Sequence, residues 1–308
     1  MSSRPKVSAI IVSYNRADDL KLCIQALLDT GYPNLEIVVV DNASKDASAD
    51  AAASFPEVKL IRSAENVGFA EGCNIGLRES TGDYIALINN DAVVAKDWFD
   101  KLVTFLEAHP NAAAAAGKIF DWNDDNPLGS LHNDYHAWVE LNLSTGFVHV
   151  AKNTPDQLRE VPTLSGACVL IRRATITQLG EPFLEPLFFT YYEETDFFVR
   201  ARRQGWQLYY TGTPVSWHRV RASGTPYHYL HHMERNRVLF AIRNFSDEAL
   251  VVALAATLWR AVETVVEQFV LRKPVLKPRS EAWRWLIANW ALLKTHRERC
   301  APHVMGDS

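Results

Sequence analysis

Short apolar runs that alternate with segments of helical spacing constrain the fold of this chain more than any other feature. The apolar runs lie at residues 7–13, 35–40, 58–61 and 84–88, and segments of helical spacing lie between them at residues 18–29, 47–54 and 70–79. Such alternation is typical of a parallel sheet with helices packed on it. We therefore predict a doubly wound α/β fold.

Polar side chains follow three of these predicted strands at the point where each one ends. They are Ser13, Tyr14 and Asn15 after the first strand, Asp41 and Asn42 after the second, and Asn89, Asn90 and Asp91 after the fourth. Turn chemistry would explain one such ending. Because the carboxyl ends of parallel strands share one edge, where open α/β sheets bind ligands, three endings together predict a ligand site.

The absence of two glycine motifs argues against two common classes of nucleotide-binding protein. Neither GxGxxG nor GxxxxGK[ST] follows the first predicted strand, so the main signatures of a Rossmann dehydrogenase and of a P-loop kinase are missing. Gly68, Gly72 and Gly76 are spaced four apart and share one face of a predicted helix. This face permits close approach of a ligand or close packing on the sheet, and both interpretations stay open.

Further elements follow, with one weakly patterned stretch among them. We predict a helix at residues 98–109, strands at 112–119 and 164–171, and a short helix ending near residue 180. Residues 120–162 mix Asp, Asn, Gly and Pro with aromatics, which indicates irregular surface structure of the kind that carries substrate specificity.

An acidic cluster at residues 188–198 is the second candidate functional stretch. Aromatic residues flank the carboxylates of Glu193, Glu194 and Asp196. Such surroundings raise the pKa of a carboxyl group, and a raised pKa suits a general base. The helix dipole also favours acids at a helix start, which would explain an acid or two but not the aromatic flanks. Beyond the cluster we predict a strand at 206–210, a turn at 212–214 and an edge strand that returns His218 to the same sheet edge.

Composition and charge limit the partners. The chain has 308 residues, 48% of them hydrophobic, and a net charge of −4, so it has no overall basic character that would indicate nucleic acid binding. Its four cysteines form no CxxC pair, which argues against a zinc cluster or disulfide framework and suits a reducing compartment. The start of the chain is interrupted by polar residues too early for a signal peptide, so we expect a cytoplasmic location.

The carboxyl-terminal part resembles a membrane-active segment. Residues 249–271 are largely apolar but carry Arg260, Glu263 and Glu267. Each charge costs roughly 2.5–3.5 kcal/mol at the centre of a bilayer, so a packed or interfacial helix is favoured over a spanning one. Residues 272–299 hold eight Lys or Arg against two Glu, a net charge of +6, with three tryptophans. This pattern predicts peripheral contact with an anionic membrane, and packing within the molecule or in a dimer is the alternative.

Taken in order, these motifs resemble those of the family 2 glycosyltransferases, inverting enzymes of the glycosyltransferase-A fold, and most closely the rhamnosyltransferase-type branch. The resemblance covers residues 7–240. Its motifs are residues 12–15, 38–44, 66–70 with 74–76, 82–91, 165–167 before Arg172-Arg173, 192–196, 200–202, 205–206, 217–218 and 234–237.

The resemblance implies an architecture and a reaction. It implies a glycosyltransferase-A catalytic domain at residues 1–225, with the donor half at about 1–118 and the acceptor half at about 119–225, and a helical region at 226–308. It also implies inverting transfer of a sugar from a nucleoside diphosphate sugar, either dTDP-rhamnose or a UDP-sugar. The acceptor would be a saccharide or lipid-linked saccharide in bacterial surface polysaccharide or lipopolysaccharide synthesis, at the inner face of the cytoplasmic membrane. The oligomeric state stays open, with a homodimer among the alternatives.

Residue roles follow from the same resemblance. Asp91 and His218 would ligate Mg²⁺ or Mn²⁺, and Glu194 would act as the general base, with Glu193 and Asp196 as alternatives. Asp41 would bond a uracil or thymine edge. The donor-binding residues would be Ser13, Tyr14, Asn15, Asp41, Asn42, Gly68, Asn74, Asn89 and Asn90.

Two departures from the family pattern leave a second function open. Asn89 replaces the first Asp of the DXD motif, and Glu193-Glu194 stands where many relatives read Glu-Asp. A catalytically inactive nucleotide-sugar-binding protein is therefore the alternative. A nucleotidyltransferase would need a Gly-rich loop with Lys or Arg after the first strand, and residues 14–17 do not provide one.

Overall fold

A computed structural model of the chain describes residues 4–123, 128, 135–152, 157–219 and 225–300. The chain folds as two compact units. The first unit comprises residues 1–140, 150–189 and 193–222, and the second comprises residues 141–149, 190–192 and 223–308. Two short internal segments therefore belong with the carboxyl-terminal helices.

A mixed, mostly parallel sheet forms the centre of the first unit. Its strands are β1 (Val7–Ser13), β2 (Leu35–Asp41), β3 (Val58–Arg62), β4 (Tyr84–Ile88), β5 (Ala92–Val94), β6 (Ala112–Asp121), β7 (Tyr135–Leu141), β8 (Val148–Lys152), β9 (Arg159–Glu160), β10 (Cys168–Arg172) and β11 (Gln207–His218). The main order is β3-β2-β1-β4-β10-β6-β11-β5. Strands β3, β2, β1 and β4 are parallel to one another, and β6 is parallel to β11. Strand β10 runs antiparallel to β4 and β6, and β5 runs antiparallel to β11. The predicted α/β sheet is confirmed.

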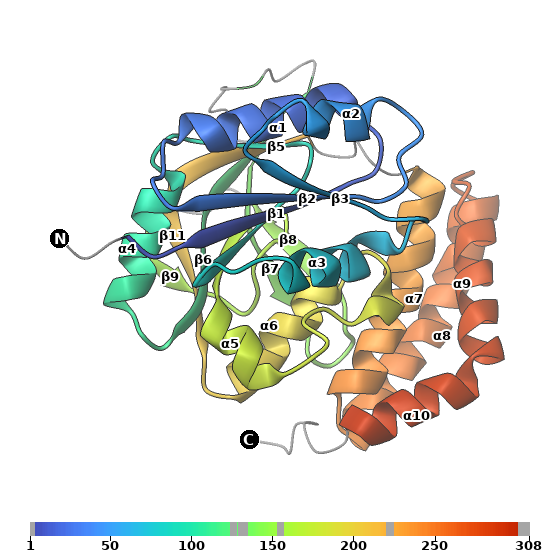
Figure 1. Cartoon of the computed structure of the whole chain (residues 1–308). Coiled ribbons are helices and arrows are strands. Elements are labelled where there is room, and N and C mark those ends of the chain that lie inside the picture. The colour runs from blue at the N-terminus through green and yellow to red at the C-terminus, as the bar shows by residue number, and fades with distance from the viewer. Residues whose placement is uncertain (1–3, 124–127, 129–134, 153–156, 220–224, 301–308) are drawn as a thin grey trace. The chain divides into compact units, whose positions relative to one another are not determined.

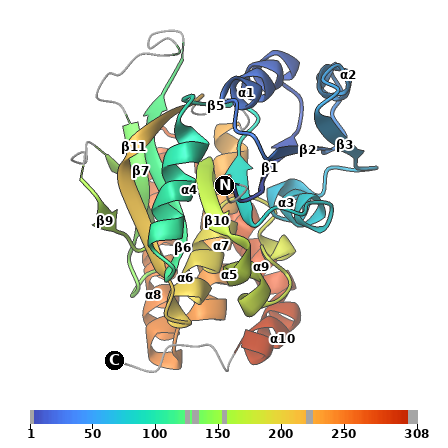
Figure 2. The ribbon, with the colours of Figure 1, turned by 60° about the vertical axis from the view of Figure 1, so that its left-hand side comes forward.

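Helices cover both faces of this sheet (Figure 1). One face carries α1 (Ala17–Asp29), α2 (Ser48–Ala53) and α4 (Trp98–Ala108), the last of which lies against β6 and β11 (Figure 2). The other face carries α3 (Gly68–Arg78), α5 (Arg173–Leu179) and α6 (Glu193–Arg203), and a short 3₁₀ helix, η1 (Pro186–Phe188), precedes α6. Side chains of β1 alternate between the two cores, with Ile11 in one and Ile10 in the other. Burial on both faces explains why the parallel strands are almost continuously apolar.

The strand register aligns the polar residues predicted at the ends of β1, β2 and β4 along the same edge of the sheet. Ser13 pairs with Asp41 across β1 and β2. Ile10 pairs with Leu87 across β1 and β4, and continuing that parallel register places Asn90 opposite Ser13.

Two predictions for the later part of the sheet were wrong. Residues 212–214 do not reverse the chain, because β11 continues through them with a register shift between Tyr210 and Val215, as at a β-bulge. His218 therefore ends a long strand between β6 and β5 rather than a separate edge strand. The stretch at residues 120–162 contains β7, β8 and β9, and Trp138 is buried there. Its residues 124–127, 129–134 and 153–156 lie outside the described part of the chain.

The second unit consists of helices around an unusually polar interior. Its helices are α7 (Pro226–Asn244), α8 (Asp247–Phe269), α9 (Leu276–Ala288) and α10 (Trp290–Cys300), and α7 contacts the other three. Arg237 of α7 is buried and donates to Glu234 Oε1 at 3.1 Å, to Thr257 Oγ1 at 2.8 Å and to the Thr145 carbonyl at 3.0 Å. One buried guanidinium thus ties α8 and the segment 141–149 to α7.

Candidate active site

The turn after β4 is held on both sides by backbone hydrogen bonds. The Asn89 amide donates to the Ala167 carbonyl at 2.9 Å, and the Ala92 amide closes the turn on the Asn89 carbonyl at 3.0 Å. The Asp91 carbonyl accepts from the Arg219 amide at 3.0 Å. These contacts fix the position of Asp91, whose side chain is only 3% exposed.

His218 faces this turn from the end of β11. Its Nε2 atom lies 3.1 Å from Asn89 Nδ2 and 3.2 Å from Asp91 Oδ1. Antiparallel pairing of β5 with β11 sets this geometry, because it places His218 opposite Ala92, the residue after Asp91. The structure thus brings together three residues that the sequence placed in one site.

Asp91 and His218 fit a divalent ion that shares its coordination with a bound substrate. Among the described residues, no group of three or more His, Cys, Asp or Glu side chains forms a complete metal cluster. Mg²⁺ in phosphate-transfer sites is usually held by one or two carboxylates, with substrate phosphates and water supplying the other oxygens. Asp91 supplies one such carboxylate, and the imidazole of His218 beside it is a further metal-ligating group.

The ends of β1 and β2 form the adjoining part of the site. Asn90 Nδ2 lies 3.3 Å from Ser13 Oγ and donates to the Asn15 carbonyl at 3.1 Å. Asp41 is buried, and its Oδ1 atom has no hydrogen-bond partner among the described residues. Leaving a buried carboxylate oxygen unpaired costs free energy, so this oxygen suits a donor from a ligand. Tyr14, which follows Ser13 in the sequence, is 38% exposed.

Asn42 and Gly68 shape the backbone next to these strand ends. Asn42 Nδ2 donates to the Gly68 carbonyl at 3.1 Å, and Asn42 Oδ1 accepts from the Val67 amide at 2.9 Å. Gly68 has a φ of +85°, and a Cβ there would lie 2.6 Å from the Phe189 carbonyl oxygen. The structure therefore gives both residues a role in the turn that opens α3.

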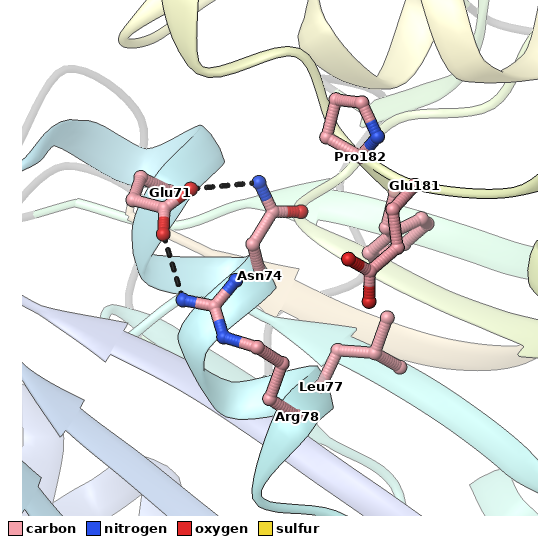
Figure 3. A pocket seen from close by; sticks show the side chains of 7 residues that line it. Glu71, Asn74, Leu77, Arg78, Glu181 and Pro182 are labelled. Carbon is pink, nitrogen blue, oxygen red and sulfur yellow. Dashed lines mark hydrogen bonds and ion pairs between the residues drawn. The ribbon is translucent and has the colours of Figure 1, made fainter.

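Asn74 is not brought to the strand-end cluster. Its amide exchanges two hydrogen bonds with the backbone of Leu184, at 2.8 and 3.0 Å, and it also donates to Glu71 Oε2 at 3.0 Å. Figure 3 shows Glu71 bridging Asn74 and Arg78 at the wall of a small pocket of about 250 Å³. The pocket is lined by Glu71, Asn74, Leu77, Arg78, Glu181, Pro182 and Phe183.

The acidic cluster opens α6, and its three carboxylates differ in accessibility. Glu193 is 3% exposed, whereas Glu194 is partly exposed. Burial raises the pKa of Glu194, and burial together with the charge of Glu194 raises the pKa of Glu193 well above its usual range. Asp196 is fully buried and lies 3.0 Å from Arg200 Nε. Among the three, Glu194 is the least buried residue, although its Oε2 atom is itself buried and has no hydrogen-bond partner among the described residues.

A short backbone segment connects the acidic pair to the corner formed by Asp91 and His218. The Gly166 amide lies 3.5 Å from Glu194 Oε1, and the carbonyl of the next residue, Ala167, accepts from the Asn89 amide at 2.9 Å. Contacts therefore run from Glu194 through residues 166–167 to Asn89, and from Asn89 through His218 to Asp91.

Sequence reasoning missed a cationic group at this corner. Asp19 is buried between Arg16, with which it pairs, and Arg219 Nη1 at 3.2 Å. The Arg219 guanidinium also lies over the Trp122 ring, 4.6 Å from its centroid. Arg16 directly follows Asn15, and Arg219 directly follows His218, so adjacency to predicted site residues could have identified both. Two guanidinium groups at the strand ends suit an anionic ligand.

Comparisons with known proteins agree with this geometry. The family model "Glycosyl transferase family 2" matches residues 8–180, more than half of the chain. The glycosyltransferase GlyA of Streptococcus pneumoniae is 28% identical over 145 residues, which is 45% of this chain and 21% of GlyA. The chain spans less than half the length of the curated relatives that it first matches.

Two solved structures share the fold. The structure of GalNAc-T7 with UDP, GalNAc and Mn²⁺ has a TM-score of 0.67 and 17% identity, and the match covers 95% of this chain and 57% of that one. The mannosyltransferase PcManGT of Pyrobaculum calidifontis, in complex with GDP-Man and Mn²⁺, has a TM-score of 0.56 and 18% identity, with 97% and 87% covered. The predicted glycosyltransferase-A type of fold is confirmed, and the chain belongs to glycosyl transferase family 2.

Proposed function

We propose that the protein transfers a sugar from a nucleoside diphosphate sugar to a hydroxyl of a saccharide acceptor, with inversion at the anomeric carbon. The observation that carries this proposal is the continuous set of contacts joining Glu194 to the Asp91–His218 corner. An enzyme of this kind needs a base for the acceptor and a cationic site for the leaving diphosphate. Glu194 would supply the base, and Asp91 and His218 would hold the metal ion that supplies the positive charge.

The donor's base would lie against the ends of β1 and β2. The Oδ1 atom of Asp41 would accept the imide N–H of uracil or thymine, and the exposed Tyr14 follows Ser13, the residue that pairs with Asp41. This pairing favours a UDP-sugar or dTDP-rhamnose. The backbone turns built by Asn42 and Gly68 would border the donor.

The diphosphate would lie at the Asp91–His218 corner. These two residues would hold Mg²⁺ or Mn²⁺, which would neutralise charge on the leaving diphosphate as a Lewis acid. Structures of GalNAc-T7 and PcManGT contain Mn²⁺ together with a nucleotide. Arg16 and Arg219 would add positive charge at the same edge.

Glu194 would take the proton of the acceptor hydroxyl as its oxygen attacks the anomeric carbon. The bond from that carbon to the diphosphate breaks as the new glycosidic bond forms, so a single displacement inverts the configuration. General-base assistance of this kind is worth roughly 10²–10⁴ in rate. Glu193 and Asp196 are the alternative bases, but their deeper burial and the contact of Asp196 with Arg200 favour Glu194.

Location and pathway belong to the same proposal. The resemblance and the family support a role in bacterial surface polysaccharide or lipopolysaccharide synthesis, and the proposed location is the cytoplasmic side of the membrane. The acceptor half at residues 119–225 would then meet a saccharide or lipid-linked saccharide.

Product analysis tests the proposed reaction. The purified chain would be incubated with Mn²⁺, a panel of UDP-, dTDP- and GDP-sugars and saccharide acceptors, with released nucleotide measured and the product's anomeric configuration read by NMR. We expect acceptor-dependent release and inverted configuration, unchanged in the surface control Glu57→Gln. A retained configuration would contradict the mechanism, and donor binding without any turnover would favour the inactive binding protein instead.

A further inference from the structure

The outer face of α8 is apolar along almost its whole length. The most exposed residues from Val251 to Leu271 are apolar, including Leu258 at 73% and Phe269 at 69% exposure, and the Glu263 side chain is 40% exposed among them. The helix has 23 residues with a mean hydropathy of 1.7 in its most apolar window, so its length and composition would suffice to cross a membrane. Soluble proteins rarely leave such a continuous apolar surface uncovered.

The polar side of α8 faces the interior of its own unit. Thr264 Oγ1 accepts from Arg279 Nη1 at 3.0 Å, and Glu267 pairs with the same buried guanidinium at 2.5 Å. Gln268 Oε1 accepts from the amides of Val275 and Leu276 at 3.1 and 3.0 Å. A surface helix of a soluble protein has the opposite arrangement, with its apolar side inward.

The packing of its polar side restricts the orientation that α8 can adopt at a membrane. Its polar side is bound to charged groups of α7 and α9, so crossing the bilayer would carry those groups into hydrocarbon, which is costly. A helix that lies in the plane of the interface avoids this, because only its apolar side enters the lipid.

Chemistry of the exposed face favours lipid over a protein partner. Among the large exposed side chains of this face, Trp259 carries a polar atom, Nε1. Its N–H already donates to Glu263 Oε1 at 2.9 Å. Protein interfaces need about one hydrogen bond per 100–200 Å², whereas hydrocarbon needs none. Directly after the face come Arg272 and Lys273, both exposed and without an ion pair to any described residue. Unpaired cations beside an apolar stripe complement anionic lipid headgroups.

Side-chain contacts tie two of the three tryptophans in the basic stretch at residues 272–299 to α7. Trp283 Nε1 donates to Glu234 Oε1 at 3.1 Å, and the Trp285 ring lies under Arg235, whose guanidinium is 4.8 Å from the ring centroid. Both tryptophans are thus engaged with α7 rather than presented outward.

We propose that α8 is an in-plane membrane anchor whose apolar outer face enters one leaflet of an anionic bilayer, with Arg272 and Lys273 at the headgroups. This surface is independent of the proposed catalytic residues. The binding partner is the lipid surface itself, recognised by an apolar face and adjacent positive charge.

Vesicle flotation of the full chain tests this anchor. We expect the parent chain to float with vesicles of phosphatidylcholine containing phosphatidylglycerol, and Leu258→Glu/Phe269→Glu to lose at least about tenfold in binding. Leu158→Glu, a matched change at an exposed leucine of the first unit, should bind as the parent does. Arg272→Gln/Lys273→Gln should bind anionic vesicles more weakly. Equal flotation of parent and Leu258→Glu/Phe269→Glu would overturn the proposal.

A second measurement does not depend on the folding of the charged variant. Brominated acyl chains should quench tryptophan emission of the parent more than that of Trp259→Phe, because Trp259 would lie within the leaflet. Equal quenching in both proteins would contradict insertion. A lipid-free dimer that Leu258→Glu/Phe269→Glu dissociates, with no vesicle binding by the parent, would overturn the anchor in favour of a second copy of the chain.

Discussion

Glu193 and Glu194 are neighbours in sequence, yet they differ in burial. Glu193 is almost fully buried, whereas Glu194 is partly exposed and its Oε1 atom lies 3.5 Å from the Gly166 amide. Two carboxyl groups held in such different surroundings often divide acid and base roles in an active site. The one that stays buried should resist ionisation most.

We expect Glu193→Gln to make the protein more stable relative to the parent as pH rises. The native pKa of Glu193 lies above the unfolded value of about 4.5. Its contribution to stability is therefore complete below that unfolded value and is lost as pH rises through the raised native value. Gln has no such ionisation. Urea unfolding of both proteins at pH 4.5 and pH 7.5 measures this, with Glu57→Gln as control, and an equal stability difference at both pH values would contradict the assignment.

Residue chemistry made part of the site predictable from sequence. Asp91, His218 and Glu194 were predicted because each stands at the end or start of a recognisable element. The Asp19–Arg219 pair could not be predicted, because its members are 200 residues apart and meet only once β11 reaches the edge near α1. Asn74 is predicted to bind the donor, but its side-chain amide forms hydrogen bonds with the backbone of Leu184, and nothing in the sequence indicates this contact.

At the scale of elements, α3 shows how the glycine spacing is used. A Cβ at Gly72 would lie 2.7 Å from Val12 Cγ1, and one at Gly76 would collide with Ile10 Cγ2. Close helix–sheet packing is therefore the structural use of both positions. The sequence placed these glycines on one face of a helix but left open whether a ligand or the sheet faced them, because both need the same small residue.

We expect Gly76→Ala to destabilise the protein by about 1–3 kcal/mol, the usual cost of forcing an extra methyl into a packed core. Ile10→Ala removes the colliding Cγ2, so the double variant should lose less stability than the sum of the two single changes. Urea unfolding of the four proteins measures this coupling. Additive losses would show that α3 does not pack on Ile10 as described.

At the scale of the whole molecule, the segment that matches the family model does not include all residues of the candidate site. The family match ends at residue 180, before both Glu194 and His218. Their proposed roles depend instead on how α6 and β11 return to the edge where β4 ends. The alternating pattern predicted the sheet, but β11 was predicted as two strands, because a Gly-Thr-Pro sequence commonly marks a turn and only the sheet context makes it a bulge.

Donor binding and sugar transfer, measured side by side for two variants, test the proposed site most directly. Calorimetry would measure binding of the nucleotide with Mn²⁺, and a transfer assay would measure turnover. We expect Asp91→Asn to lose Mn²⁺-dependent nucleotide binding together with transfer, because the carboxylate that would hold the metal is gone. Glu194→Gln should keep nucleotide binding and lose transfer by roughly 10²–10⁴, the usual contribution of a general base. Transfer by Glu194→Gln near the parent rate, or unchanged Mn²⁺-dependent binding by Asp91→Asn, would contradict the assignment.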